Sequence, residues 1–351
     1  MGALEPVFEK ILATPPRPDG GVEIGRSREG RPIDAWRLGT GPVAISLIAG
    51  CHADEPVGPE LLRRLCAWLA GRPAEHPLLT GYRWSVVPHV NPDGEQRNAG
   101  WSRATDSVTD HRGNPDRGFD LAAYLDGAVR EPPGDDVEFG FPRRVDDTGA
   151  RPENRAVAGF LAAGGPYRLH ASLHGMGFAP GIWFLLEETW EERTAALRQA
   201  LAGRARSMGY PLLDVDRRGE KGFRRIAEGF STRPDSRAMT AFFESRGEPD
   251  TAALFRHSSM ELARSLGGDP LTVVSEMPLF LLAPAGVGGP PFRPGTAGGR
   301  ELRLWLDRLV AEVKGDPDQL ADRGVRPMPL GDQMRLQLAL IDQALRSVGG
   351  G

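Results

Sequence analysis

The chain has 351 residues, a formal net charge of −4 and 26% charged residues. This length fits one large α/β domain or two smaller ones, because a domain typically holds roughly 100–200 residues. The charge is balanced and shows no basic patch, so no nucleic-acid partner is expected. No apolar run could span a bilayer and the N-terminus does not resemble a secretion signal, so we expect a cytoplasmic protein without membrane contact. Cys51 and Cys66 have neither the number nor the spacing of a disulfide framework.

Strand and helix patterns alternate along most of the chain. A hairpin is predicted over 27–38, with Gly30 at its turn. The run over 42–50 is continuously apolar, as expected of a strand covered on both faces. Further strands are predicted at 82–88, 168–174, 181–186 and 271–277, and helices at 56–70, 154–163, 190–208, 250–266 and 301–313. This alternation predicts a single α/β domain with a mixed, mostly parallel central sheet and helices on both faces.

Two regions depart from this pattern. Residues 91–151 are rich in Asp, Arg, Gly and Pro and show little periodicity, and loops this long in a compact domain are usually functional or disordered. From residue 315 a Pro/Gly/Asp linker leads to an amphipathic helix over 333–346, which either packs on the body or forms a dimer contact. We therefore expect a catalytic domain over 1–314 and a linker with a C-terminal helix over 315–351, and the oligomeric state stays open.

His52 and Glu55 stand three residues apart, directly after the apolar strand predicted at 42–50. Imidazole nitrogen and carboxylate oxygen suit Zn²⁺, and catalytic zinc sites usually take three protein ligands and leave one position to water. His174, at the end of another predicted strand and followed by glycine, is the natural third ligand. Taken alone, the pair also fits a capped loop histidine and a carboxylate in the first turn of a helix.

Glu276 stands at the end of a strand that is otherwise almost wholly apolar. A carboxylate there is costly to bury unless it is paired or takes part in chemistry. Beside a metal-bound water it would act as the general base, and the alternative is a buried salt bridge with an arginine. Asp120 is a candidate acceptor for the second nitrogen of a metal-bound imidazole, and its alternative is an ordinary loop aspartate.

The chemistry-bearing residues occur in a characteristic order. They are H-x-x-E at 52–55, N-P-D-G at 91–94, G-x-D-L at 118–121, P-E at 152–153, His-Gly at 174–175 and Glu276. This set, from about residue 27 to 278, resembles the zinc metallocarboxypeptidases, whose type member is carboxypeptidase A and whose relatives include succinylglutamate desuccinylases and aspartoacylases. The resemblance implies a carboxypeptidase-like fold and one zinc ion bound by His52, Glu55 and His174, with a zinc-bound water activated by Glu276.

The resemblance also implies roles for residues near the metal. Asp120 would orient the first histidine ligand, and Arg112 would polarise the scissile carbonyl and stabilise the oxyanion. Arg97 is the rival of Arg112 for that role, because it follows N-P-D-G more closely.

The chain departs from the family where a substrate carboxylate is normally bound. In the peptidases G-x-D-L is followed by an Asn-Arg pair, whereas Ala122 and Ala123 stand here and offer no donor. Either another arginine takes over or the substrate is not an ordinary peptide C-terminus. The candidate arginines are Arg117, Arg224, Arg225, Arg233 and Arg237. The family's substrate tyrosine has no clear counterpart either, since Tyr210 stands in a context typical of a structural residue.

The leading hypothesis is therefore a zinc metallopeptidase-like hydrolase that cleaves an amide bond in a peptide or an acylated amino acid. One alternative is an N-acyl amino acid deacylase, which the missing Asn-Arg pair and the H-A-D-E context favour. N-P-D-G and the long central insertion favour a peptidase. A second alternative is a non-catalytic zinc-binding relative, which would not require a carboxylate such as Glu276 at an apolar strand end.

Overall fold

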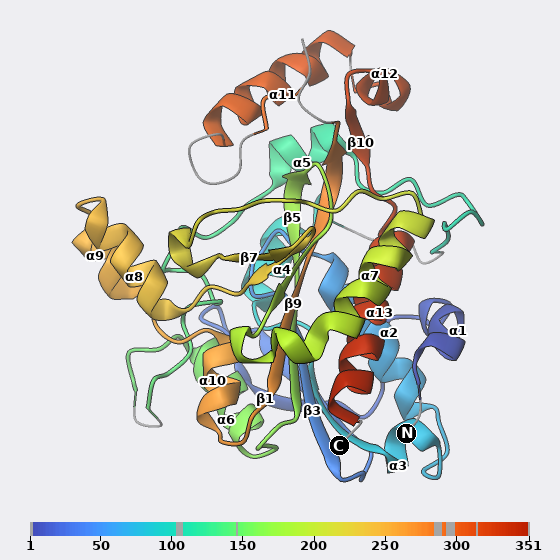
Figure 1. Ribbon diagram of the computed structural model, residues 1–351, viewed down its shortest axis with the longest axis vertical. Helices are drawn as coiled ribbons and strands as arrows, with labels where there is room; N and C mark the ends of the chain where they lie inside the picture. The colour runs from blue at the N-terminus through green and yellow to red at the C-terminus, as the bar shows by residue number, and fades with distance from the viewer. Residues whose placement is uncertain are drawn as a thin grey trace.

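The computed structural model describes residues 3–102, 108–144, 147–283, 290–292, 299–313 and 315–349. In this part of the chain one ten-stranded sheet runs through the molecule, with helices packed on both of its faces (Figure 1). No helix of the described residues combines the length and apolar character that crossing a bilayer requires.

The strand order places the longest strands at the centre of the sheet. The order is β1 (Val22–Arg26), β2 (Pro32–Leu38), β4 (Tyr82–Val87), β3 (Val43–Ala49), β5 (Leu169–Ala179), β9 (Leu271–Leu282), β6 (Trp183–Leu186), β8 (Phe230–Thr232) and β7 (Arg225–Ala227), and β10 (Val325–Pro327) also pairs with β9. The four central strands β4, β3, β5 and β9 are parallel to one another. Outside this centre, antiparallel pairs join β1 to β2, β2 to β4, β6 to β9, β7 to β8 and β9 to β10. The prediction of a mixed sheet is confirmed: its centre is parallel, and β6 and β8 form a further parallel pair nearer the edge.

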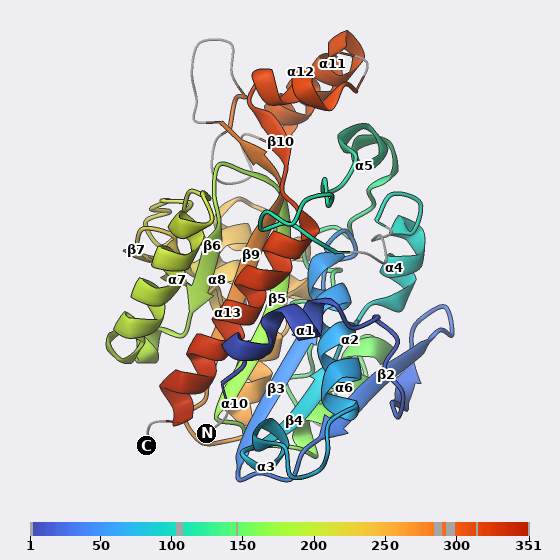
Figure 2. The same ribbon diagram turned by 90° about the vertical axis from the view of Figure 1, so that its right-hand side faces the viewer.

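Each face of the sheet is covered by its own helices. On one face lie α2 (Val57–Ala70), α13 (Leu330–Gly349), α7 (Ala195–Ser207) and the short α1 (Phe8–Leu12) (Figure 2). The other face carries α6 (Pro152–Ala162) and α10 (Ser259–Ser265). Alternate side chains of β3 serve the two layers: Ile45 and Leu47 pack in the larger core, and Ala44 and Ile48 in the smaller one. This double burial explains the continuously apolar strand in the sequence.

The C-terminal helix α13 packs on the body of the molecule. It contacts α2, α7, β5 and β9, and most of its length is buried, including the polar side chains of Gln333 and Gln337. Gln337 donates a hydrogen bond to the carbonyl oxygen of His174 at 3.2 Å. The division of the chain at residue 314 stays a prediction.

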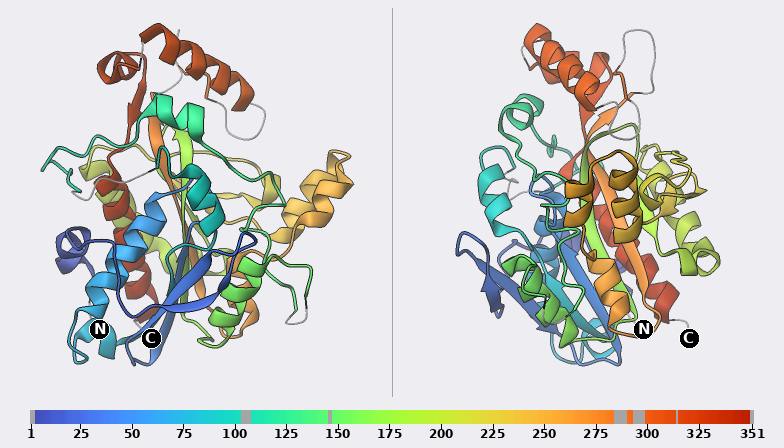
Figure 3. Two further views of the ribbon diagram at one scale, coloured as in Figure 1. Left: turned by 180° about the vertical axis from the view of Figure 1, so that it is seen from behind. Right: turned by 90° about the vertical axis from the view of Figure 1, so that its left-hand side faces the viewer.

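The remaining helices lie at the rim. They are α3 (Pro77–Thr80), α4 (Pro92–Asn98), α5 (Leu121–Gly127), α8 (Ser236–Ser245), α9 (Pro249–Leu254), α11 (Gly299–Val313) and α12 (Pro317–Asp322). Figure 3 shows α11 standing over α5 at one end of the molecule. The single helix predicted over 250–266 is wrong, because the chain is extended at Phe255 and Ser258 starts α10 with a capping box to Glu261. Residues 91–151 contain only α4, α5 and otherwise irregular chain among the residues described there.

Candidate metal centre and substrate cavity

A sharp turn after β3 places His52 and Glu55. The strand ends at Ala49, and Gly50 follows with a φ of 71°, a conformation that favours glycine. A Cβ atom at this position would also lie 2.5 Å from Nδ1 of His89, so no larger residue fits without a shift. The chain then passes through His52 and Glu55 before α2 begins at Val57. Both side chains are thereby held at the end of a buried central strand.

His174 and Glu276 lie inside their strands, not at the strand ends that the sequence predicted. β5 continues to Ala179 and β9 to Leu282, and these two strands stay paired well past His174. β3, in contrast, stops at Ala49, opposite Leu173. His174 is therefore the first residue of β5 beyond the end of its neighbour, and Glu276 is its partner on β9. The end of β3, rather than of β5 or β9, opens the site.

The three predicted ligands converge through four atoms. Nδ1 of His52 lies 2.7 Å from Oε1 of Glu55, and Nδ1 of His174 lies 2.9 Å from Oε2. The two Nδ1 atoms are 3.2 Å apart, and one potential ligand atom from each residue lies within 4.8 Å of the others. Glu55 and His174 are buried and His52 is partly exposed. Two imidazole nitrogens with one carboxylate form a donor set that fits Zn²⁺.

The electrostatics of these three residues favour a bound cation. Burial alone would raise the pKa of Glu55, but His52 and His174 hold that pKa well below its ordinary value. Burial likewise opposes the charged form of His174, yet Glu55 raises the pKa of His174 well above the usual imidazole value. The carboxylate of Glu55 thus stabilises a positive charge at the imidazoles, and a divalent metal ion at the same place would be stabilised in the same way.

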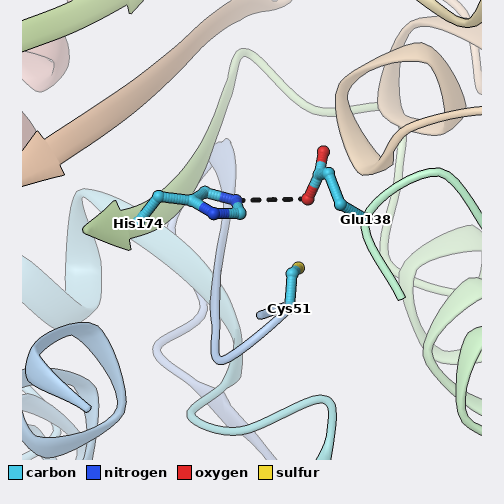
Figure 4. A group of neighbouring side chains, drawn as sticks. All are labelled: Cys51, Glu138 and His174. Atoms are coloured by element: carbon cyan, nitrogen blue, oxygen red, sulfur yellow. Dashed lines mark ion pairs between the residues drawn. The ribbon is translucent and has the colours of Figure 1, made fainter. Parts of the chain in front are cut away.

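The outer nitrogens of the two imidazoles face other acceptors. Nε2 of His174 lies 2.8 Å from Oγ of Ser172 and 3.1 Å from Oε2 of Glu138. Figure 4 shows the contact between His174 and Glu138. Nε2 of His52 lies 3.9 Å from Oδ2 of Asp136. A carboxylate hydrogen-bonded to the outer nitrogen of a ligating histidine fixes its tautomer and orientation; Glu138 lies at such a distance, whereas Asp136 lies beyond it.

Asp120 does not take the orienting position that the resemblance implied. It is exposed and caps α5, and its Oδ1 accepts a hydrogen bond from the backbone N–H of Ala123 at 2.7 Å. Asp136 occupies the position beside His52 instead. Asp136 and Glu138 were not singled out in the sequence, where an acidic run over 135–138 inside the long irregular segment was the available signal.

Cys51 lies near a second group of potential ligand atoms, which includes Glu138 and shares His174 (Figure 4). Burial, reinforced by the charge of Glu138, raises the pKa of the Cys51 thiol to about 12. Metals bind the thiolate, which is scarce at neutral pH under these conditions. Cys51 is therefore a buried thiol, and His52, Glu55 and His174 make the better site.

Glu276 faces the same cavity as His52 and His174. Burial and the nearby charge of Glu55 raise the pKa of Glu276 to about 8. Among the described residues no arginine forms an ion pair with Glu276, so the salt-bridge alternative has no partner in this part of the chain. Glu276 is partly buried, and a carboxyl with a raised pKa beside a cation site is suited to proton transfer.

Arg130 is the arginine that reaches the metal centre. Its Nη1 lies 3.1 Å from Oε1 of Glu55 and 3.2 Å from Oδ1 of Asp54, and it lines the cavity. Arg130 could not be singled out in the sequence, because nothing in the irregular segment distinguishes it from the other arginines there. Arg112, predicted for this role, is exposed and does not line the cavity. Its rival Arg97 pairs with Glu29 at 2.5 Å and Glu131 at 3.5 Å, and does not line the cavity either.

The other predicted substrate-binding arginines lie away from the cavity. Arg117 is exposed, and none of the five candidates lines the cavity. Arg224 pairs with Glu188 and Glu191, Arg225 with Asp214, and Arg233 with the buried Glu187. Arg237 lines a separate polar depression. Tyr210 donates a hydrogen bond to Asp332 at 2.5 Å and has the structural role expected from its context.

The cavity around this centre has a volume of about 680 Å³. One wall comes from α5 and α11, through Tyr124, Leu302 and Leu306. Another comes from β6, β9, the start of α10 and residues 213–223, and it is mainly apolar. The residues of this second wall include Trp183, Leu185, Leu213, Val215, Phe223, Met260 and Val274.

The chain was compared with known protein families. A family model described as zinc carboxypeptidase matches residues 10–180. The matched segment contains His52, Glu55 and His174, and it ends before Glu276 and before most of the apolar wall.

Two curated carboxypeptidases match parts of the chain. Carboxypeptidase Z of Gallus gallus is 32% identical over 174 residues, covering 43% of this chain and 26% of that protein. Carboxypeptidase SOL1 of Arabidopsis thaliana is 33% identical over 81 residues, covering 20% of this chain and 16% of that protein. The chain thus spans about a quarter or less of the length of these relatives.

Solved structures of metallocarboxypeptidases align with most of the chain at low identity. A metallo-carboxypeptidase from Burkholderia cenocepacia is 18% identical, with a TM-score of 0.47, covering 98% of this chain and 68% of that one. Bovine thrombin-activatable fibrinolysis inhibitor, solved in complex with tick carboxypeptidase inhibitor, is 14% identical, with a TM-score of 0.47, covering 99% of this chain and 97% of that one.

Proposed function

We propose that the protein is a zinc-dependent hydrolase that cleaves an amide bond of a peptide. His52, Glu55 and His174 would hold one zinc ion, and Glu276 would act as the general base. The observation that carries the proposal is the convergence of two Nδ1 atoms on both oxygens of Glu55, with Glu276 paired opposite His174 on the next strand.

The residues of the chain divide the chemistry among them. Zinc bound at this site would supply Lewis acidity and lower the pKa of a water ligand. Glu276 would take a proton from the attacking water and pass it to the leaving nitrogen. A cation at the three ligands would also stabilise the ionised carboxylate of Glu276, whose pKa of about 8 is raised by burial and by Glu55. Proton transfer near neutral pH would follow.

Arg130 would stabilise the charge that develops on the scissile carbonyl. Its guanidinium has five donors, of which the contacts with Asp54 and Glu55 use only Nη1. Arg130 lines the cavity with its side chain 43% exposed, and hydrogen bonds from its remaining donors to an oxyanion there would be stronger than in bulk water. Glu138 and Ser172 would orient the imidazole of His174 through its outer nitrogen.

The size and lining of the cavity favour a peptide over a small acylated amino acid. At about 680 Å³ it has room for groups on both sides of a scissile amide, and separate walls from α5 and α11 and from β6 and β9 could contact them. An N-acyl amino acid deacylase would use the same residues, so substrate choice is what distinguishes the two.

The test uses Glu276→Gln in zinc-loaded protein. We expect zinc content near one ion per chain and turnover lower by about 10²- to 10⁴-fold, because the base is removed while the ligands remain. Glu192→Gln, a substitution at an exposed carboxylate of the short 3-10 turn Glu192–Thr194, serves as the matched control. Metal analysis and hydrolysis of blocked dipeptides and N-acyl amino acids are the measurements. Unchanged turnover in Glu276→Gln would remove Glu276 as the base, and turnover of N-acyl amino acids alone would replace the peptidase with a deacylase.

A further inference from the structure

The cavity contains cations that the proposed chemistry does not use. Four of its described lining residues are cationic: Arg130, Arg217, Lys221 and Arg303. Arg130 is held at Glu55 and Asp54, and Arg303 pairs with Asp307 at 2.9 Å and donates to the carbonyl oxygen of Leu125. Arg217 and Lys221, named here the cationic pair, lie together on the segment between Leu213 and β7.

A stack of rings leads from Glu276 to Arg217. Trp183 on β6 is the register partner of Glu276 on β9, and both residues line the cavity. The ring of Phe223 lies 5.0 Å from that of Trp183, and the guanidinium of Arg217 lies 4.5 Å over the ring of Phe223. Trp183 is fixed by a hydrogen bond of 3.1 Å to Oγ of Ser231. The guanidinium is therefore held at a defined position along the apolar wall.

The charges of the cationic pair are not fully balanced. Nη2 of Arg217 pairs with the partly exposed Glu220 at 2.9 Å, but its buried Nε has no hydrogen-bond partner among the described residues. Lys221 has no carboxylate within ion-pair distance in the described chain, and its ammonium lies 4.5 Å from the ring of Phe242. Burial, and next the charge of Arg217, lowers the pKa of Lys221. Glu220 is the one carboxylate that forms an ion pair with either cation in the described chain, so the positive charge of the pair is not neutralised and would favour a bound anion.

We propose that Arg217 and Lys221 bind a carboxylate of the substrate, on the leaving-group side of the scissile amide, and so replace the donors that are absent at Ala122 and Ala123. The apolar wall before them, with Trp183, Val215, Met260 and Val274, would accept a large apolar group of the same residue. Charge-assisted hydrogen bonds from a guanidinium suit a carboxylate, and the ring stack limits where that carboxylate lies. The identity of the leaving group rests on the proposed hydrolase function, whereas the affinity for an apolar carboxylate does not.

The binding test uses 3-phenylpropanoate and its uncharged analogue 3-phenylpropanamide with zinc-loaded protein in isothermal titration calorimetry. We expect the acid to bind more tightly than the amide, and Arg217→Gln to weaken the acid by about 10- to 100-fold while leaving the amide unchanged. Lys221→Gln should weaken the acid by about 3- to 10-fold. Arg225→Gln, on the neighbouring strand and paired with Asp214 outside the cavity, is the matched control and should have no effect. A carboxylate that bound only to zinc would not respond to Arg217→Gln, and that result would overturn the proposal.

Hydrolysis then identifies which carboxylate is bound. The substrates are an N-blocked dipeptide with C-terminal Phe, its C-terminal amide, and an N-blocked dipeptide amide that ends in Glu. An effect of Arg217→Gln on KM that disappears on amidation assigns the terminal carboxylate, and one that persists with the Glu amide assigns a side-chain carboxylate. If no substrate is cleaved but acid binding depends on Arg217, the hydrolase proposal fails and the carboxylate site stands. If cleavage occurs and neither KM nor acid binding responds to Arg217→Gln, the carboxylate site fails alone.

Discussion

The candidate metal centre and the cationic pair are held in different ways. The side chains of the centre lie where β3, β5 and β9 run side by side. The cationic pair lies on an irregular segment that contains only the short 3-10 turn η4 (Glu220–Gly222). At the centre, the spacing of parallel strands fixes the distance between His174 and Glu276. On the segment, stacking on Phe223 and Trp183 fixes Arg217 instead. On the two proposals above, residues fixed by the sheet would carry out the reaction, and residues of the irregular segment would select the substrate. This is a common division between a scaffold and its loops.

The largest expected effect is at the metal centre. His174→Ala removes one of the three ligands and leaves the buried Glu55 with a single imidazole, so zinc affinity should fall by more than about 100-fold and turnover should be lost. Zinc affinity is measured by competition with a chelator, and turnover with the blocked dipeptide. His76→Ala, at the N-cap of α3, leaves the cavity unchanged and should retain both. Tight zinc binding by His174→Ala would place the metal elsewhere.

A smaller effect is expected at Arg130, the arginine beside Glu55. Arg130→Lys keeps a positive charge beside Glu55 but loses the planar donors, so kcat should fall by about 10²- to 10³-fold. Arg112→Lys is the matched control. The resemblance assigned the same role to Arg112, but its side chain is exposed, so kcat should not change. Zinc content is measured in both variants. A loss of kcat in Arg112→Lys with normal kcat in Arg130→Lys would return the role to Arg112.

That His52, Glu55 and His174 lie close together could be predicted from the sequence, because their positions depend on local spacing and on apolar strands. His52 and Glu55 follow a buried strand at a fixed separation, and His174 and Glu276 are polar residues in apolar runs. Their placement at strand ends was wrong in detail. The site opens where β3 stops beside β5, and which strands are neighbours is a property of the whole sheet that a single strand pattern does not contain.

Residues of the irregular segments could not be placed in the same way. Asp120 and Arg112 were assigned from motif order within residues 91–151, where neither period 2 nor period 3.6 restricts the direction of a side chain. Asp136 and Arg130 occupy those positions instead. Arg217 was likewise indistinguishable from Arg224 and Arg225, since only the stack on Phe223 turns it into the cavity.

The smallest expected effect tests whether water and protons are excluded from β5, the strand that carries His174. His170 lies on β5, is fully buried, and has Oγ of Ser46 2.8 Å from its Nδ1. Burial lowers the pKa of His170 to about 4, against about 6.5 in an unfolded chain. The unfolded chain therefore binds a proton that the folded protein excludes, and stability falls as the pH is lowered from about 6.5 towards 4. By linkage, protonation of His170 in the unfolded chain should lower the free energy of unfolding by about 2 kcal/mol when the pH falls from 7.5 to 5.

Urea denaturation of the metal-free protein at both pH values measures this loss without a contribution from zinc release. His89 is also buried with a pKa lowered to about 4 by burial, so the unmodified chain should lose stability at both positions. His170→Gln removes one of them and should lose about 2 kcal/mol less than the unmodified chain over the same pH range. Gln at this position keeps a polar group near Ser46, which limits the loss of stability at pH 7.5. An equal loss in both proteins would mean that His170 takes up a proton in the folded protein as readily as in the unfolded chain, and that burial does not lower its pKa.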